Sequence, residues 1–323
     1  MLATLGQRLL AGLAVVLGVV TLTFVLLHLA PGDPIDIILG PTASAEQIAV
    51  QRRILGLDRP LPAQFVGWLG RFARGDWGNS ITKGRAVRAI LGDAWPATVR
   101  LVGLSLILSY LIGLAIGVVQ AARSRSRTDT LLSISSVTLF AVPGYWLGLM
   151  LVLVFTYWTQ ALPAFGAAGL DSDYLHGGRW LIDRLRHLAL PLATLTLIGI
   201  GGAARFARGA MLDILSQPFI VTARAKGLTA SRVVGRHALR NALTPVVTLI
   251  GLSLPVLFSG AVFVEAVFAW PGVGRVLVEA VQARDYPVVM AATTVSAVLV
   301  VAGNMLADAL AAWLDPRIRS ATA

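Results

Sequence analysis

Long apolar runs separated by polar stretches dominate the chain. Runs of about 18 or more apolar residues can cross the hydrocarbon layer as helices, and the pattern predicts six of them, at residues 9–30, 98–119, 131–158, 188–204, 245–264 and 288–310. The first run exceeds the apolar core of a typical signal peptide, so we interpret it as a retained span. The third exceeds one crossing, and Pro143 with Gly144 predicts a kink within it. The expected fold is therefore all-α, a polytopic membrane protein with six transmembrane helices.

The polar stretch at residues 31–97 predicts short helices between the first two spans. The segment Pro31 to Pro34 is expected to end the first span. Ser44, followed three residues later by Gln47, has the spacing of a capping box and predicts a helix that reaches about Leu55. A second helix is expected to start at Pro62 and to end at Gly75, with one aromatic and apolar face formed by Phe65, Trp68, Leu69 and Phe72. Such a face favours packing on the membrane interface or on the protein itself over ligand binding.

Small residues predict close helix packing inside the spans. Gly113 with Gly117, and Gly144 with Gly148, have the small-xxx-small spacing that lets helix backbones approach each other. Near the end of the chain, Asp285 is expected to cap the last span, with Pro287 in its first turn.

Composition and charge support a membrane protein and orient it. Apolar residues make up 56% of the chain and charged residues only 13%, whereas soluble proteins carry about 25% charge. With six spans, both termini share one side with the loop at residues 205–244, which we call the basic loop. That side holds 13 basic and four acidic residues, against 14 and 12 on the other side. The positive-inside rule therefore predicts that both termini and the basic loop face the cytoplasm.

The basic loop has the most distinctive local pattern in the chain. Five cations without an intervening acid follow one another in its central part: Arg224, Lys226, Arg232, Arg236 and Arg240. Gly227 followed by Thr229 predicts that one helix ends and another begins there. The alternative interpretation is a positive loop that only fixes membrane orientation.

Residues that an enzyme or an ion-coupled transporter needs are missing from the pattern. The two lysines, Lys83 and Lys226, do not end a phosphate-binding GxxxxGK[ST] loop, so ATP binding by this chain is not expected. The absence of cysteine, together with four scattered histidines, predicts no metal site. Ser253 and Ser259 lie outside any GxSxG turn, which disfavours the alternative of an intramembrane enzyme. No charged residue lies at a predicted span centre, where coupling acids would be expected. The energy for any transport must come from another protein.

Eleven short motifs follow one another in an order that resembles a known family. They are HLAPGDP at 28–34, LGLDRPL at 55–61, GDWGNS at 75–80, PATVRL at 96–101, VPGYWLG at 142–148, ALP at 161–163, TARAKGL at 222–228, RHALRNAL at 236–243, FAWPGVGR at 268–275, RDYP at 284–287 and LDPRIR at 314–319. The set resembles permease subunits of bacterial ABC importers of the dipeptide, oligopeptide and nickel family. Val221 and Thr222 depart from the Glu-Ala start of the general importer loop, which weakens any claim for an acidic anchor at position 221.

The resemblance implies a type I ABC importer permease fold in the bacterial inner membrane, with short periplasmic helices. It implies an N-terminal tail and first span at 1–30, a periplasmic region at 31–97, a core permease domain at 98–312 and a cytoplasmic tail at 313–323. The implied cargo is a di- or oligopeptide, and nickel or a metal chelate is the alternative. No cofactor is expected in this chain, since ATP would be bound by the partners.

The resemblance also implies partners and site residues. The partners are a second permease, homologous or identical, two ATPase subunits, a substrate-binding protein and the bilayer; nucleic acid is not among them. Ala223, Ala225 and Gly227 would be small so that a short helix can seat in a groove of the ATPase. The full coupling set is Thr222, Ala223, Arg224, Ala225, Lys226, Gly227, Leu228, Arg232, Arg236, His237, Arg240 and Asn241. An outer rim or gate would contain Glu265, Trp270, Gly272, Arg275 and Asp285.

Overall fold

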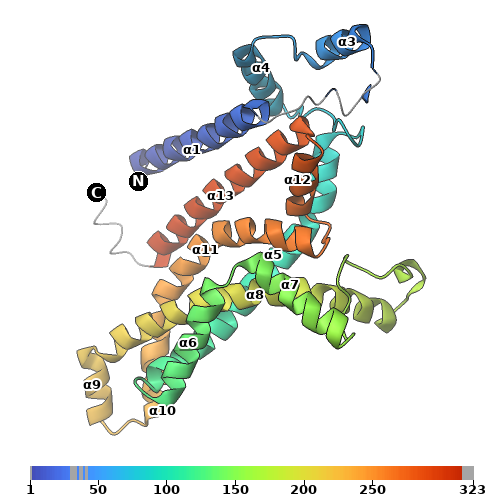
Figure 1. The fold of residues 1–323 in the computed structure, drawn as a ribbon. Coiled ribbons are helices and arrows are strands. Elements are labelled where there is room, and N and C mark those ends of the chain that lie inside the picture. Colours follow the sequence, from blue (N-terminus) through green and yellow to red (C-terminus); the bar gives the residue numbers. More distant parts are fainter. Residues whose placement is uncertain (1, 30–34, 36–38, 41–42, 315–323) are drawn as a thin grey trace. The chain divides into compact units, whose positions relative to one another are not determined.

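The computed structural model describes residues 2–29, 35, 39–40 and 43–314, and this part of the chain is helical without a strand (Figure 1). The predicted turn at 31–34 and the tail from residue 315 lie outside the described residues. The α-helices are α1 Leu2–Leu29, α3 Ala45–Leu55, α4 Leu61–Ala73, α5 Val87–Ala122, α6 Arg127–Ala141, α7 Gly144–Val152, α8 Gly178–Leu215, α9 Pro218–Ala225, α10 Ala230–Arg232, α11 Leu239–Val267, α12 Val273–Gln282 and α13 Tyr286–Leu314. Two π-helices, η1 Leu153–Trp158 and η3 Val233–Ala238, and the 3-10 helix η2 Ser172–Tyr174 complete the set.

Long apolar helices account for most of the predicted spans. Helices α1, α5, α8 and α13 are each long and apolar enough to cross a membrane. Helices α6 and α7–η1 form a fifth candidate, bent by 101° at the break that contains Pro143, which confirms the predicted kink. The predicted fifth span falls in α11, where the described apolar segment, Phe258–Val267, is shorter than a crossing. The total of six spans therefore stays a prediction.

Two helices extend well beyond the predicted span boundaries. Helix α5 begins at Val87 and continues through Pro96, which the sequence pattern had placed at the end of a polar stretch. Val87, Leu91 and Ala94 recur on one helix face and are buried, so burial of that face favours the helix despite the proline. Helix α8 likewise continues through Pro191 and reaches Leu215, past the expected end near residue 204.

The chain divides into two compact units. Unit 1 contains residues 1–98 and 271–301, and unit 2 contains residues 99–270 and 302–323. The core of unit 1 joins the start of α5 to α12 and the first turns of α13, with Val87, Leu91, Val288 and Ala292 among its buried members. In unit 2, α6, α7 and α11 pack on α8.

The predicted small residues lie at close helix contacts in unit 2. A Cβ atom added to Gly117 would lie 2.6 Å from the Cβ of Ala207 and 2.7 Å from the backbone oxygen of Ala204. Gly113 faces Ala203 at a similar distance. No side chain fits between α5 and α8 at these positions, so the glycines serve helix packing, as predicted.

The two short helices before α5 also follow the sequence pattern. The capping box is present: the Ser44 hydroxyl accepts from the backbone of Gln47, and the Gln47 side chain accepts from the backbone of Ser44. The aromatic face of α4 packs within unit 1, where Phe65 contacts Phe24, and Phe72 stacks on Trp77. Phe65 and Phe72 therefore pack within unit 1 as expected, while Trp68 of the same face also lines a cavity.

Candidate functional site

The basic loop is a helix, a tight turn and a second helical segment. Helix α9 ends at Ala225, and Gly227 adopts a φ of 79°, in the left-handed region that favours glycine. Thr229 occupies the cap position of α10 with extended backbone, although its side chain makes no capping hydrogen bond. Helix α10 continues through η3 into α11. The predicted helix end at Gly227 and helix start at Thr229 are both confirmed.

A small apolar cluster fixes the loop to the rest of unit 2. Ile220 and Ala223 of α9 are buried together with Val233 and Ala238 of η3 and with Met211 of α8. Ala223 is only 7% exposed, so its small size serves packing within this chain. The expectation that the short helix seats in a groove of another protein stays a prediction. Ala225 and Gly227 remain exposed.

The cations of the loop face solvent. Arg224, Lys226, Arg232, Arg236 and Arg240 are all exposed, and none of them forms an ion pair within the described part of the chain. Figure 1 shows α9 and α10 beyond the C-terminal end of α8. The remaining predicted coupling residues differ in exposure: Thr222 and Asn241 are exposed, while Leu228 and His237 are half-buried. The structure thus presents a dense cationic surface on an internally packed loop.

An ion pair at the base of the loop was not recognised as a pair from the sequence. Asp129, in the first turn of α6, is 4% exposed, and Arg208 of α8 donates to it from Nε and Nη2, each at 2.8 Å. The backbone N–H of Arg125 donates to the same carboxylate at 2.9 Å. The guanidinium of Arg205 lies 5.3 Å from the centre of the Phe140 ring. Two of the seven basic residues of the loop therefore serve contacts within unit 2.

The five predicted outer-rim residues do not form one exposed set. Glu265 and Trp270 belong to unit 2 and are buried. The backbone N–H of Trp270 donates to the backbone carbonyl oxygen of Glu265 at 2.9 Å. Gly272 and Asp285 belong to unit 1 and are buried as well. Arg275 is half-buried, and it is the most accessible member of the set.

Asp285 joins two of the sequence motifs, GDWGNS and RDYP. Its carboxylate accepts hydrogen bonds from the hydroxyl groups of Ser80 and Thr82 and from the backbone N–H groups of Ile81 and Thr82, both at 3.1 Å. The side chain was expected to cap α13. Its hydrogen bonds go instead to the loop at residues 80–82, while its backbone oxygen accepts from Val289 at the start of that helix. A carboxylate with several donors is strongly held, so Asp285 ties the start of α13 to this loop.

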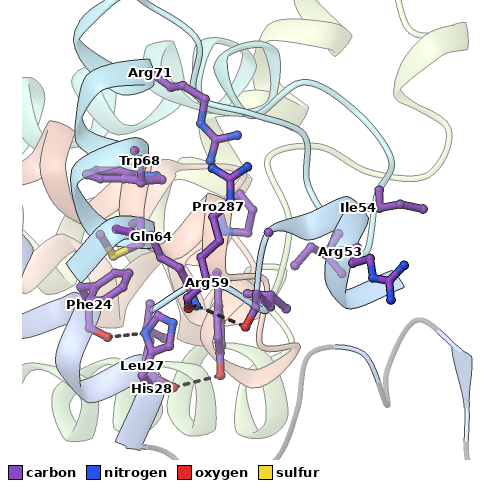
Figure 2. Close-up of a pocket in the computed structure, with 17 residues that line it drawn as sticks. Phe24, Leu27, His28, Arg53, Ile54, Arg59, Gln64, Trp68, Arg71 and Pro287 are labelled. Atoms are coloured by element: carbon purple, nitrogen blue, oxygen red, sulfur yellow. Dashed lines mark hydrogen bonds between the residues drawn. The ribbon is translucent and has the colours of Figure 1, made fainter. Parts of the chain in front are cut away.

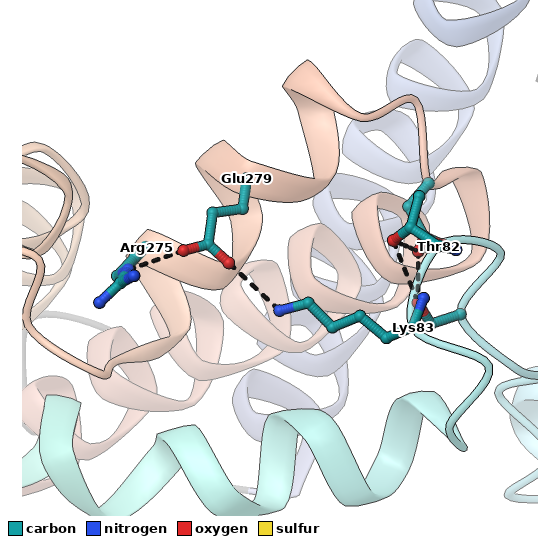
Figure 3. Close-up of polar contacts among 6 residues, drawn as sticks. Thr82, Lys83, Arg275 and Glu279 are labelled. Carbon is teal, nitrogen blue, oxygen red and sulfur yellow. Dashed lines mark hydrogen bonds and ion pairs between the residues drawn. The ribbon is translucent and has the colours of Figure 1, made fainter. Parts of the chain in front are cut away.

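A second polar contact lies next to this one (Figure 3). Glu279 of α12 accepts from Arg275 at 2.7 Å and from Lys83 at 3.1 Å. Burial acts to raise the pKa of Glu279, but the hydrogen bonds from Arg275 and Lys83 outweigh it and hold the pKa below its ordinary value. Glu279 was not among the predicted site residues, because an i,i+4 pair on a short helix carries no functional signal of its own.

Comparison with known proteins assigns the chain to a protein family. Residues 113–320 match the family of binding-protein-dependent transport system inner membrane components, and residues 1–102 match the N-terminal region of such membrane components. The chain belongs to this family. This permease is 39% identical to an oligopeptide transport system permease protein of Bacillus subtilis, over 98% of this chain and 99% of the relative. It is also 39% identical to a probable D,D-dipeptide transport system permease protein of Escherichia coli, over 97% and 96% of the two chains.

A solved structure shares the fold of the permease. The match is to an inward-facing structure of the MetNI methionine ABC transporter, with a TM-score of 0.55 and 17% sequence identity, over 70% of this chain and 96% of that chain. At this identity the likeness concerns the fold alone, and it confirms the expected importer permease architecture.

Proposed function

We propose that this permease is the membrane subunit of an ATP-driven importer of di- or oligopeptides, and that its basic loop docks on separate ATPase subunits. The names of the two relatives support peptide as the cargo. The observation that supports docking is the group of five exposed cations on an internally packed loop. Exposed charges that form no ion pair with the described residues of their own chain are suited to meet acids on another protein, where they set orientation and partner choice.

The anchoring of the loop supports a coupling role. Ile220 and Ala223 pack against α8 through Met211, and Arg208 of α8 holds Asp129 of α6. A displacement of α9 by a moving ATPase would therefore reach α8 and α6 through buried contacts, since packed interiors transmit movement. In this proposal ATP is bound by the partners, and this chain converts their closure into a change of access across the membrane.

The remaining partners follow from the same proposal. A second permease, homologous or identical, would complete the translocation pathway, and a binding protein would deliver peptide to the outer side. Both termini and the basic loop would lie in the cytoplasm, in agreement with the charge distribution. Among the predicted outer-rim residues, Arg275 is the candidate for contact with the binding protein, because the other four are buried.

Charge reversal in the assembled transporter tests this function. We expect Arg224→Glu combined with Arg236→Glu to weaken ATPase association by about tenfold per reversal and to abolish ATP-dependent peptide uptake in proteoliposomes. Arg179→Glu is the matched control, since Arg179 is exposed but lies outside the loop. Normal uptake by the double variant would contradict the docking role, while uptake of nickel but of no peptide would contradict the cargo.

A further inference from the structure

A cavity of about 350 Å³ in unit 1 combines cationic, aromatic and apolar side chains (Figure 2). Its lining comes from the last turns of α1, from α3 and α4 with the turn between them, and from the first turns of α13. The volume is in the range of small-molecule sites. The coupling role proposed above makes no use of this cavity.

Two arginines converge at the cavity without a carboxylate. Figure 2 shows the side chains of Arg59 and Arg71 extending toward each other, whereas Arg53 points away. Gln64 holds the turn that carries Arg59, because its Nε2 donates to the backbone oxygens of Arg59 at 2.8 Å and of Leu57 at 3.3 Å. The lining contains no Asp or Glu, and neither guanidinium forms an ion pair among the described residues. Like charges held together favour an anion between them, and arginine pairs suit phosphate oxygens.

Two residues that line the cavity each carry a buried polar atom for which the described part of the chain provides no hydrogen-bond partner. The Nε1 of Trp68 and the Nε2 of His28 are buried and have no hydrogen-bond partner among the described residues. The Nδ1 of His28 lies 2.8 Å from the carbonyl oxygen of Phe24. Since a carbonyl can only accept, Nδ1 carries the hydrogen of this contact. Both atoms are closed off from solvent, so a ligand in the cavity reaches them only if neighbouring side chains move.

The position of the cavity indicates where such a ligand comes from. Phe24, Leu27 and His28 lie at the end of one candidate membrane span, and Tyr286 and Met290 at the start of another. Tyr286 is the first residue of its span, and tyrosine at a span end is typical of the layer where lipid headgroups lie. A peptide would bring an ammonium group, for which the lining offers no acid.

We propose that this cavity binds the headgroup of an anionic phospholipid of the phosphatidylglycerol type. The phosphodiester lies between Arg59 and Arg71, and the glycerol part of the headgroup lies against the side chains of Trp68 and His28. Phe24, Leu27 and Met290 cover the glycerol backbone and the first carbons of the acyl chains. A bound lipid thus links α1, α4 and α13 within unit 1.

Native mass spectrometry of the purified full-length permease tests this site, with dioctanoyl-phosphatidylglycerol as the probe. We expect it to bind about tenfold more tightly than dioctanoyl-phosphatidylcholine, which adds a cation, and Arg59→Gln with Arg71→Gln should lower the affinity by about tenfold per arginine. Arg74→Gln, at the end of the same helix but outside the cavity lining, should bind as the unchanged protein does.

A second variant keeps both arginines and fills the space. Gly67 lines the cavity, and a Cβ at this position would have no atom within 4 Å, so Gly67→Leu should fold and exclude the lipid. Equal binding of the two lipids, unchanged in both variants, would overturn the proposal. Glycerol 3-phosphate binding as tightly as the lipid would overturn it in favour of a soluble anion, and displacement of the lipid by alanyl-alanine would overturn it in favour of the cargo.

Discussion

Gly227→Asp should uncouple transport without unfolding the permease. Gly227 has a φ of 79° between α9 and α10, and a Cβ at this position would have no atom within 4 Å. A side chain therefore meets no steric clash, and the cost is backbone strain of about 1 to 2 kcal/mol for a residue other than glycine in the left-handed region. This is a small loss for a membrane protein with several long packed helices.

The same strain energy is large compared with the free energy that decides ATPase docking. If the ATPase requires the observed turn, about 1 to 2 kcal/mol corresponds to a loss of about five- to thirtyfold in association. The aspartate also brings a negative charge next to Arg224 and Lys226, which neutralises part of the cationic surface. We expect normal insertion, weak ATPase association, and either little ATP hydrolysis or hydrolysis without peptide uptake.

Three substitutions at this position separate conformation from charge. Gly227→Ala adds strain alone, while Gly227→Asn matches aspartate in shape and in its tolerance of the left-handed region but carries no charge. The expected order of association is glycine, asparagine, alanine and then aspartate, measured by co-purification of the ATPase subunits and by uptake in proteoliposomes. Normal association and uptake for Gly227→Asp would refute the reasoning and leave the basic loop as an orienting segment.

Three further predictions concern other parts of the chain. Asp129→Asn should lower the free energy of unfolding by about 3 kcal/mol, because Arg208 then faces a buried site without its anion. Thermal unfolding in detergent measures this loss, and an unchanged midpoint would contradict it. The hydrogen bonds from Arg275 and Lys83 hold the pKa of Glu279 below its ordinary value in the folded chain. Its stabilising contribution is therefore complete above the unfolded-state pKa and is lost as the pH falls through the lower folded value. Glu279→Gln should lose less stability in acid than the unchanged protein does, and equal losses would count against this. Ser231→Cys should react with a membrane-impermeant thiol reagent only after cells are opened, whereas Asp173→Cys should react in intact cells. The reverse pattern would overturn the predicted orientation, in which the basic loop faces the cytoplasm.

Local signals in the sequence predicted local structure well. The turn at Gly227, the bend at Pro143 and the capping box at Ser44 each depend on residues within a few positions of one another. The backbone preference of glycine, proline or serine decides such features with little help from the rest of the chain.

Features that depend on distant residues could not be predicted in this way. Asp285 was expected to cap its own helix, but its carboxylate binds residues 80–82, far away in the sequence. The burial of Ala223 follows from the packing of η3 against α9, which the local sequence pattern does not reveal. Pro96 marked a boundary in the sequence, yet α5 passes through it because its apolar face is buried. In each case tertiary packing outweighs the local preference.

Site-specific cross-linking in the assembled transporter tests the central claim most directly. A photoreactive amino acid at Ser231, which is exposed between the cations of the basic loop, should form an adduct with the ATPase subunit, and the yield should change when ATP is added. The same group at Asp173, exposed in the other predicted compartment, should form no such adduct. Adducts with the ATPase from Asp173 and none from Ser231 would contradict the account.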